Sequence, residues 1–91
     1  MYGRRVVVWG GGSKAVSFLT TLGIAGQVDC AVDINPFKQG KFIAGTGHEV
    51  VAPEALRERR PDLVVAMNPI YLAEIGAQLS ELGLQAELVA V

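Results

Sequence analysis

The sequence contains little cysteine and little histidine, and each shortage excludes a class of site. Its 91 residues include one cysteine, Cys30, and one histidine, His48. One thiol cannot close an internal disulfide, and one cysteine with one histidine cannot supply the ligands of a zinc site, so we predict no metal centre. Cys30 lies in the apolar run VDCAV, which indicates a buried, reduced thiol in a cytoplasmic protein.

An excess of charge and long apolar runs are also missing. Eight lysines and arginines nearly balance nine aspartates and glutamates, so that the net charge is −1. We therefore expect no nucleic-acid partner and no attachment to an anionic membrane. No apolar run approaches the roughly 20 residues of a membrane-spanning helix, and the start of the chain has no signal-peptide pattern. Because 51 % of the residues are hydrophobic, the composition favours a small globular domain.

What the chain does contain is an alternation of apolar runs and helical patterns. The run Val6–Trp9 is continuously apolar, as in a strand covered on both faces. A helix is expected over Ser13–Leu22, and Asn68 and Pro69 are typical of the N-cap and first residue of another. Further strands are expected at Val28–Val32, Glu49–Val51, Leu63–Met67 and Glu87–Ala90, with a short helix from Pro53 through Arg57.

This alternation predicts an α/β fold in one domain over residues 1–91, with a parallel sheet of four to five strands between two layers of helices. A topological switch point is expected between Val6–Trp9 and Leu63–Met67, and ligands bind at the carboxyl ends of strands at such a point. The expected strand order is Val28–Val32, Val6–Trp9, Leu63–Met67, Glu87–Ala90, with Glu49–Val51 outside Val28–Val32.

The glycine-rich loop Gly10-Gly11-Gly12-Ser13-Lys14 begins at this switch point. Glycine permits positive φ angles and close approach of a ligand to the backbone, and the N–H groups of the following helix attract an anion. Lys14 adds a positive charge. The loop therefore predicts the binding of an anionic group, although glycines at this place also serve simply to turn the chain.

Asp33 makes one nucleotide hypothesis more specific. Gly10, Gly12 and Ala15 satisfy the pattern G-x-G-x-x-A, and Asp33 ends the next strand about twenty residues later, where NAD-binding folds carry their ribose-binding acid. An independent NAD-binding or nucleotide-binding module is therefore one hypothesis. Asp33 could equally organise the turn that it begins with Ile34, Asn35 and Pro36.

Two catalytic interpretations of the glycine loop fail. A Walker loop requires lysine directly after glycine, and here Lys14 follows Ser13. A serine-hydrolase elbow around Ser13 would need an acid and then a histidine later in the chain, but His48 comes too early. No catalytic residue is therefore predicted. On the other side of the switch point, Asn68 and Tyr71 are candidates for contact with a ligand, Tyr71 by stacking on a base or sugar ring.

Three longer strings resemble a known family. VVVWGGGSKAVSFL, VDINPFKQGKF with AGTGHEVVAPEAL, and PDLVVAMNPIYLAEI follow one another as in the C-terminal domain of S-adenosylmethionine-dependent methyltransferases, which the C-methyltransferases of nucleotide-linked deoxysugars share. The resemblance covers Val6 to Val91, and the string Asp-x-Asn-Pro-x-Lys-Gln-Gly-Lys is its most specific part. The chain departs from the family at Ala15, where members commonly carry glycine, at Ala44-Gly45, where Pro-Gly is common, and at Met67, where tryptophan is frequent.

The resemblance implies a Rossmann-like domain taken from a longer protein. It places S-adenosylmethionine and the catalytic residues in an upstream domain, so that this domain binds no cofactor, and it implies that Gly10 to Lys14 and Asn68 line the substrate side. We therefore expect an accessory domain that binds or encloses a small-molecule acceptor, such as a nucleotide-linked sugar, without catalysis of its own. The expected partners are the upstream domain and the acceptor, and a homodimer and a purely structural cap are alternatives.

Overall fold

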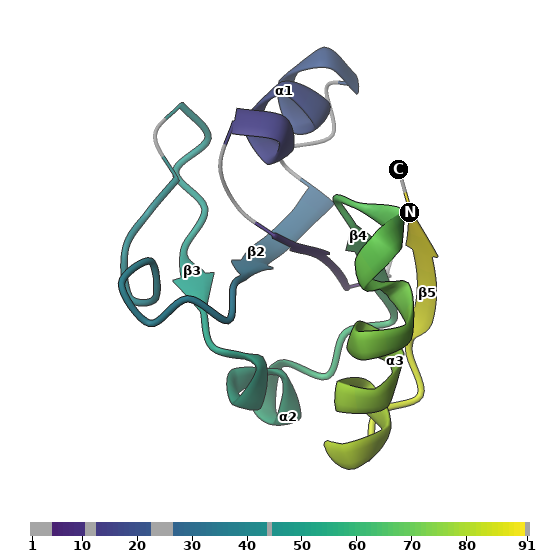
Figure 1. The fold of residues 1–91 in the computed structure, drawn as a ribbon. Coiled ribbons are helices and arrows are strands. Elements are labelled where there is room, and N and C mark those ends of the chain that lie inside the picture. The colour runs from purple at the N-terminus through teal and green to yellow at the C-terminus, as the bar shows by residue number, and fades with distance from the viewer. Residues whose placement is uncertain (1–4, 11–12, 23–26, 44, 91) are drawn as a thin grey trace.

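A computed structural model of the chain describes residues 5–10, 13–22, 27–43 and 45–90. Strands and helices alternate along these residues (Figure 1). The strands are β1 (Val6–Trp9), β2 (Val28–Val32), β3 (Val50–Val51), β4 (Leu63–Ala66) and β5 (Glu87–Ala90). The helices are α1 (Ser13–Leu22), α2 (Leu56–Arg59) and α3 (Leu72–Glu81), with short 3-10 turns η2 (Pro53–Ala55) and η3 (Pro69–Tyr71) before α2 and α3.

The five strands form one parallel sheet in the order β3-β2-β1-β4-β5. This is the order that the sequence predicts, with the short β3 outside β2. Two strands are shorter than expected. Met67 follows β4, although its N–H still donates to the carbonyl of Trp9 at 3.1 Å. Glu49 precedes β3 and instead pairs with Phe42 in an antiparallel bridge.

Helices cover both faces of the sheet, α1 on one face and α2 with α3 on the other (Figure 1). The alternation of side chains along β1 divides the core accordingly. Val6 and Val8 lie in the cluster that contains Leu19 of α1. Val7 and Trp9 lie in the cluster that contains Leu56 of α2, together with Ile75 and Leu79 of α3. Every residue of β1 is buried, which explains why its sequence is apolar throughout.

Local signals in the sequence begin η2 and η3 and end α3 as expected. Pro53 opens η2 and Pro69 opens η3, each at a position where a missing N–H costs nothing. Gly83 follows α3 with a φ of +73°, a conformation that favours glycine. Arg60 ends α2 in the left-handed region, with φ 46°, so α2 extends two residues beyond the expected Arg57.

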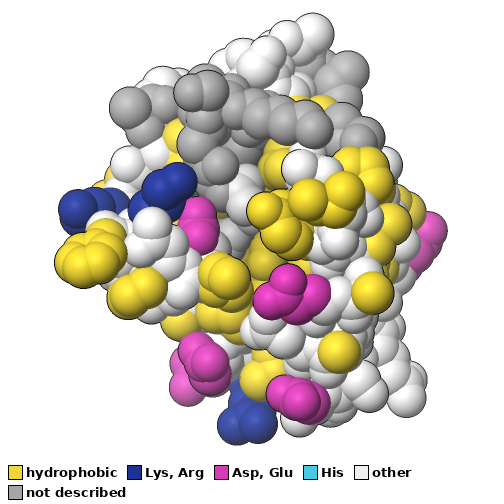
Figure 2. Space-filling view, in the orientation of Figure 1, with side chains coloured by type: hydrophobic (Ala, Val, Ile, Leu, Met, Phe, Trp, Pro, Cys, Tyr) yellow, Lys and Arg dark blue, Asp and Glu magenta, His cyan; other side chains and the backbone are white. Residues whose placement is uncertain are grey.

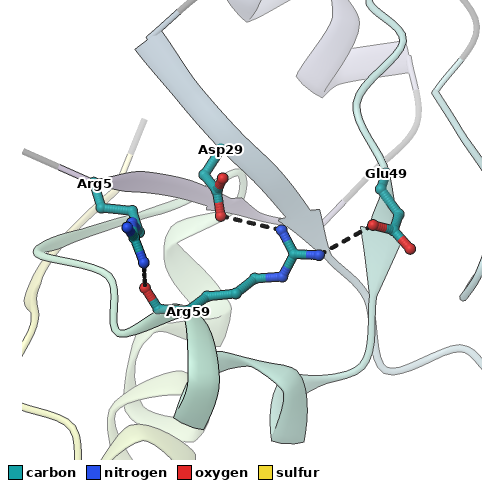
Figure 3. A network of polar contacts seen from close by, with 4 residues as sticks. All are labelled: Arg5, Asp29, Glu49 and Arg59. Carbon is teal, nitrogen blue, oxygen red and sulfur yellow. Dashed lines mark hydrogen bonds and ion pairs between the residues drawn. The ribbon is translucent and has the colours of Figure 1, made fainter.

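An arginine joins segments that are distant in the sequence (Figure 3). The guanidinium of Arg59 donates to Asp29 of β2 at 3.1 Å and to Glu49 at 3.0 Å, while the Arg59 carbonyl accepts from Arg5. These side chains are 31–42 % exposed, so each ion pair is screened by solvent and contributes little by itself. The network connects the end of α2 with β2 and with the residue before β3. Beside it, Cys30 is fully buried, as the sequence predicts.

Candidate functional site

A cavity of about 330 Å³ opens at the carboxyl ends of β1, β2 and β4, beside the start of α3. This is the switch point that the strand order creates, because β2 and β4 lie on opposite sides of β1. The described residues that line it are Trp9, Gly10, Asp33, Ile34, Met67, Asn68, Tyr71, Glu74 and Ile75.

The structure thus brings together four of the residues that sequence analysis selected: Gly10, Asp33, Asn68 and Tyr71. Two others, Gly11 and Gly12, lie outside the described residues. Ser13 and Lys14 form the first turn of α1, and their side chains lie outside the description. The binding role of all eight stays a prediction.

Gly10 carries the chain from β1 toward α1. Its φ is +99°, which a residue with a side chain adopts only with strain. Its N–H donates to the carbonyl of Val32 at 2.7 Å, so this donor is used within the sheet. A Cβ added at Gly10 would lie 3.5 Å from the Cβ of Met67, an ordinary contact. The requirement for glycine here is therefore conformational.

Asp33 follows β2 and organises the turn after it. Its carboxylate accepts the N–H of Asn35 at 2.9 Å, and the Asn35 side chain in turn accepts the N–H of Phe37 at 3.0 Å. Lys38 lies near the second carboxylate oxygen, with 3.8 Å between the Lys38 Nζ and the Asp33 Oδ2. Asp33 therefore fills the turn-forming role that sequence analysis gave as an alternative, and it also lines the cavity.

Asn68 and Tyr71 form the wall on the β4 side. The Asn68 side-chain oxygen accepts the N–H of Ile70 at 3.2 Å, so Asn68 is the N-cap that the sequence predicts. Tyr71 is 49 % exposed and leaves part of its ring open to a ligand. Sequence analysis missed Trp9, Ile34, Met67 and Ile75 as lining residues. A signal was present for Trp9 and Met67, because both end apolar runs that the fold aligns at one edge.

The rim of the cavity carries exposed apolar side chains. Figure 2 shows hydrophobic side chains on both sides of a hollow on this face, with acidic side chains among them. Ile34 is 57 % exposed and Ile70 is 76 % exposed, and they follow β2 and β4, the two strands on either side of β1. Exposed apolar groups of this size around a cavity are typical of ligand or protein contact. Glu74 is exposed and also belongs to the lining.

Within the described ranges, no group of three or more histidine, cysteine, aspartate or glutamate side chains could hold a metal ion. His48 lies in the turn before β3 and is not among the described lining residues. The cavity described here has apolar side chains and two carboxylates in its wall. No helix in the described part of the chain combines the length and apolar character that a membrane crossing requires.

Solved structures confirm the fold. UDP-D-quinovosamine 4-dehydrogenase from Vibrio fischeri is similar with a TM-score of 0.74 and 15 % identity, over 97 % of this chain and 77 % of that chain. The Rex-family repressor RSP gives a TM-score of 0.66 and 17 % identity, over 97 % of this chain and 52 % of that chain. RSP in complex with β-NADH gives a TM-score of 0.64 and 19 % identity, over 97 % of this chain and 53 % of that chain. At these identities the likeness shows a Rossmann-like fold alone.

A search of curated proteins found no match. The family model described as "C-methyltransferase C-terminal domain" matches residues 1–89, which is nearly the whole chain. It includes all of the described cavity residues and agrees with the resemblance found in the sequence. The chain therefore belongs to the C-methyltransferase C-terminal domain family.

Proposed function

We propose that this domain binds the methyl acceptor of an S-adenosylmethionine-dependent C-methyltransferase and helps to enclose it, while an upstream domain of the same protein holds the methyl donor. The observation that carries the proposal is the cavity at the switch point, lined by Gly10, Asp33, Asn68 and Tyr71. Its volume of about 330 Å³ is at the lower end of the range of small-molecule sites. A cavity of this size holds part of a substrate, and the rest of the substrate would contact another domain.

The proposed roles of this domain and of the upstream domain rest on the residues that line the cavity. The described lining has two carboxylates, an amide and two aromatic rings between apolar side chains, a combination that orients a ligand by hydrogen bonds and apolar contact. Family membership supplies the reaction class, C-methylation. We therefore assign the domain a role in acceptor binding and expect no methyl transfer by this chain alone.

Tyr71→Ala is expected to raise the KM for the acceptor about tenfold in the full-length enzyme and to leave kcat nearly unchanged. Tyr71 is a half-exposed aromatic residue of the cavity wall, so removing its ring takes away contact made equally in the ground state and the transition state. The measurement is steady-state methyl transfer with varied acceptor. Phe42→Ala is the matched control, because Phe42 is an exposed aromatic residue outside the described lining.

The result that would contradict this proposal is an unchanged KM in folded Tyr71→Ala and Asp33→Asn enzymes. The domain would then be a structural cap. Far-ultraviolet circular dichroism and a urea melt of each variant establish that it is folded before the kinetic comparison is made.

A second candidate, binding of NAD or a related nucleotide, is favoured by one observation. The fold matches a repressor solved with β-NADH, and Asp33 directly follows β2, where NAD-binding folds carry their ribose-binding acid. However, the Asp33 carboxylate already accepts the N–H of Asn35 and lies near Lys38. The chain also spans only about half of the repressor.

NADH is therefore expected to bind this chain with a Kd weaker than about 1 mM, which is at most about 4 kcal/mol of binding free energy. Isothermal titration calorimetry with the 91-residue chain measures it. Micromolar binding that is lost in Asp33→Ala would favour the nucleotide module over the accessory domain.

A further inference from the structure

The charged groups in the described wall of the cavity have one sign. They are the carboxylates of Asp33 and Glu74. Lys38 lies 3.8 Å from the Asp33 Oδ2 but is not among the described lining residues. Its ammonium group offsets part of the Asp33 charge, and Glu74 then leaves the described part of the wall with a net negative charge. A carboxylate accepts hydrogen bonds and donates none, so this wall favours ligand groups that donate.

Three backbone donors at the ends of the central strands are already used. The Gly10 N–H donates to Val32 at 2.7 Å, and the Met67 N–H donates to Trp9 at 3.1 Å. The Asp33 N–H donates to Val51 at 3.1 Å. These three groups sit at the edge of the cavity, where a phosphate would require free N–H groups, and each has a partner inside the protein.

The start of η3 is closed to an anion for the same reason. Pro69 has no N–H, the Ile70 N–H donates to the Asn68 side chain at 3.2 Å, and the Tyr71 N–H donates to the Asn68 carbonyl at 3.2 Å. The N-terminal turn of a helix binds anions through free N–H groups. At the start of η3, Pro69 has no N–H and Asn68 accepts the next two N–H groups, so none of these three positions offers a free donor.

From these contacts we infer that the described wall of the cavity takes the uncharged or cationic part of the ligand, through hydroxyl or amine groups that donate to Asp33 and Glu74, and that it repels phosphate. The inference rests on the proposed function, because it states which part of the acceptor enters. The sequence-based expectation of an anion site concerns a different set of groups, the loop whose Gly11 and Gly12 lie outside the described residues.

Trp9 provides a direct test, because it is the only tryptophan in the sequence and it lines the cavity. Its fluorescence in the 91-residue chain is measured with a cationic quencher (caesium), an anionic quencher (iodide) and a neutral one (acrylamide), at constant ionic strength. A negative wall concentrates caesium and depletes iodide. Each quenching constant is divided by that of N-acetyltryptophanamide with the same quencher, because caesium is intrinsically the weaker quencher. We expect acrylamide to quench Trp9 and the normalised caesium constant to exceed that of iodide by about fivefold.

Three variants assign the effect to the cavity. Glu74→Gln is expected to bring the caesium-to-iodide ratio close to one, and Lys38→Gln to raise it. Glu81→Gln is the matched control, since Glu81 lies on the same helix, α3, about 10 Å further along its axis, and it should leave the ratio unchanged. Normalised iodide quenching equal to or greater than that of caesium, or no quenching by acrylamide, would overturn the inference.

Inorganic phosphate gives a second, independent measurement. Amide signals of Ile70 and Tyr71 are followed by nuclear magnetic resonance up to 50 mM phosphate, and we expect no saturable shift, whereas saturable shifts would overturn the inference. The two proposals fail separately. An unchanged acceptor KM in Tyr71→Ala enzyme with caesium-selective quenching rejects acceptor binding here, and a raised KM with iodide-selective quenching rejects the ligand class.

Discussion

Leu56→Ala is expected to lower the free energy of unfolding by about 2–5 kcal/mol. Leu56 begins α2, which has four residues, and its side chain is fully buried among Val7, Val64 and other residues of the α2–α3 face. A helix this short has little stability of its own, so it depends on this contact. A 91-residue domain has roughly 5–14 kcal/mol of stability in total, so the loss is a large fraction. Urea unfolding followed by Trp9 fluorescence measures it.

Leu82→Ala is the matched control for this experiment. It removes the same atoms from the same face of the sheet, but Leu82 is only partly buried at the end of α3. Its effect should be smaller, because less apolar surface returns to water and the site opens to solvent. Equal losses in the two variants would mean that α2 is not held by the Leu56 contact.

The second large effect concerns the single thiol at high pH. Burial raises the pKa of Cys30 from 9.0 to about 11, the carboxylates of Asp29 and Glu49 act in the same direction, and the Arg59 guanidinium opposes them. Because the folded pKa lies above the unfolded one, the unfolded chain releases this proton first. The contribution to stability is therefore complete below pH 9 and is lost as the pH rises toward 11, by about 2 kcal/mol.

Urea unfolding at pH 8, 9.5 and 10.5 tests this. The Cys30→Ala variant provides the reference, since its cavity costs the same at every pH while its thiol titration is gone. The stability difference between wild type and variant should shrink as the pH rises. Parallel pH profiles would show that the thiol has the same pKa in both states.

Much of the fold follows from local sequence. The continuous apolar run at Val6–Trp9 predicts a central strand because only a strand covered on both faces requires it. Asn68 and Pro69 predict the start of the helix after β4 because capping depends on neighbouring residues. The strand order then follows from right-handed crossovers. None of these inferences requires a contact between distant residues.

The parts that local sequence could not supply depend on such contacts. Arg59 joins Asp29 and Glu49, which are brought together only when α2 packs below the sheet. The cavity wall also depends on contacts between distant residues. Ile34 follows β2 and Ile75 lies in α3, and they line the same cavity only once the sheet has formed. Asp33 could be assigned a turn from its own sequence, but its distance to Lys38 depends on how the whole turn closes.

The central place of β1 has a consequence for synthesis of the chain. β1 pairs with β2 on one side and with β4 on the other, Val6 being opposite Leu63. At translation rates of about 5–20 residues per second, β4 emerges roughly 2–7 seconds after β2. During that interval β1, the strand buried on both faces, has one edge without its native partner. Unpaired apolar edges promote association between chains. The nascent chain on the ribosome, more than the finished domain, is therefore the species that is exposed to aggregation.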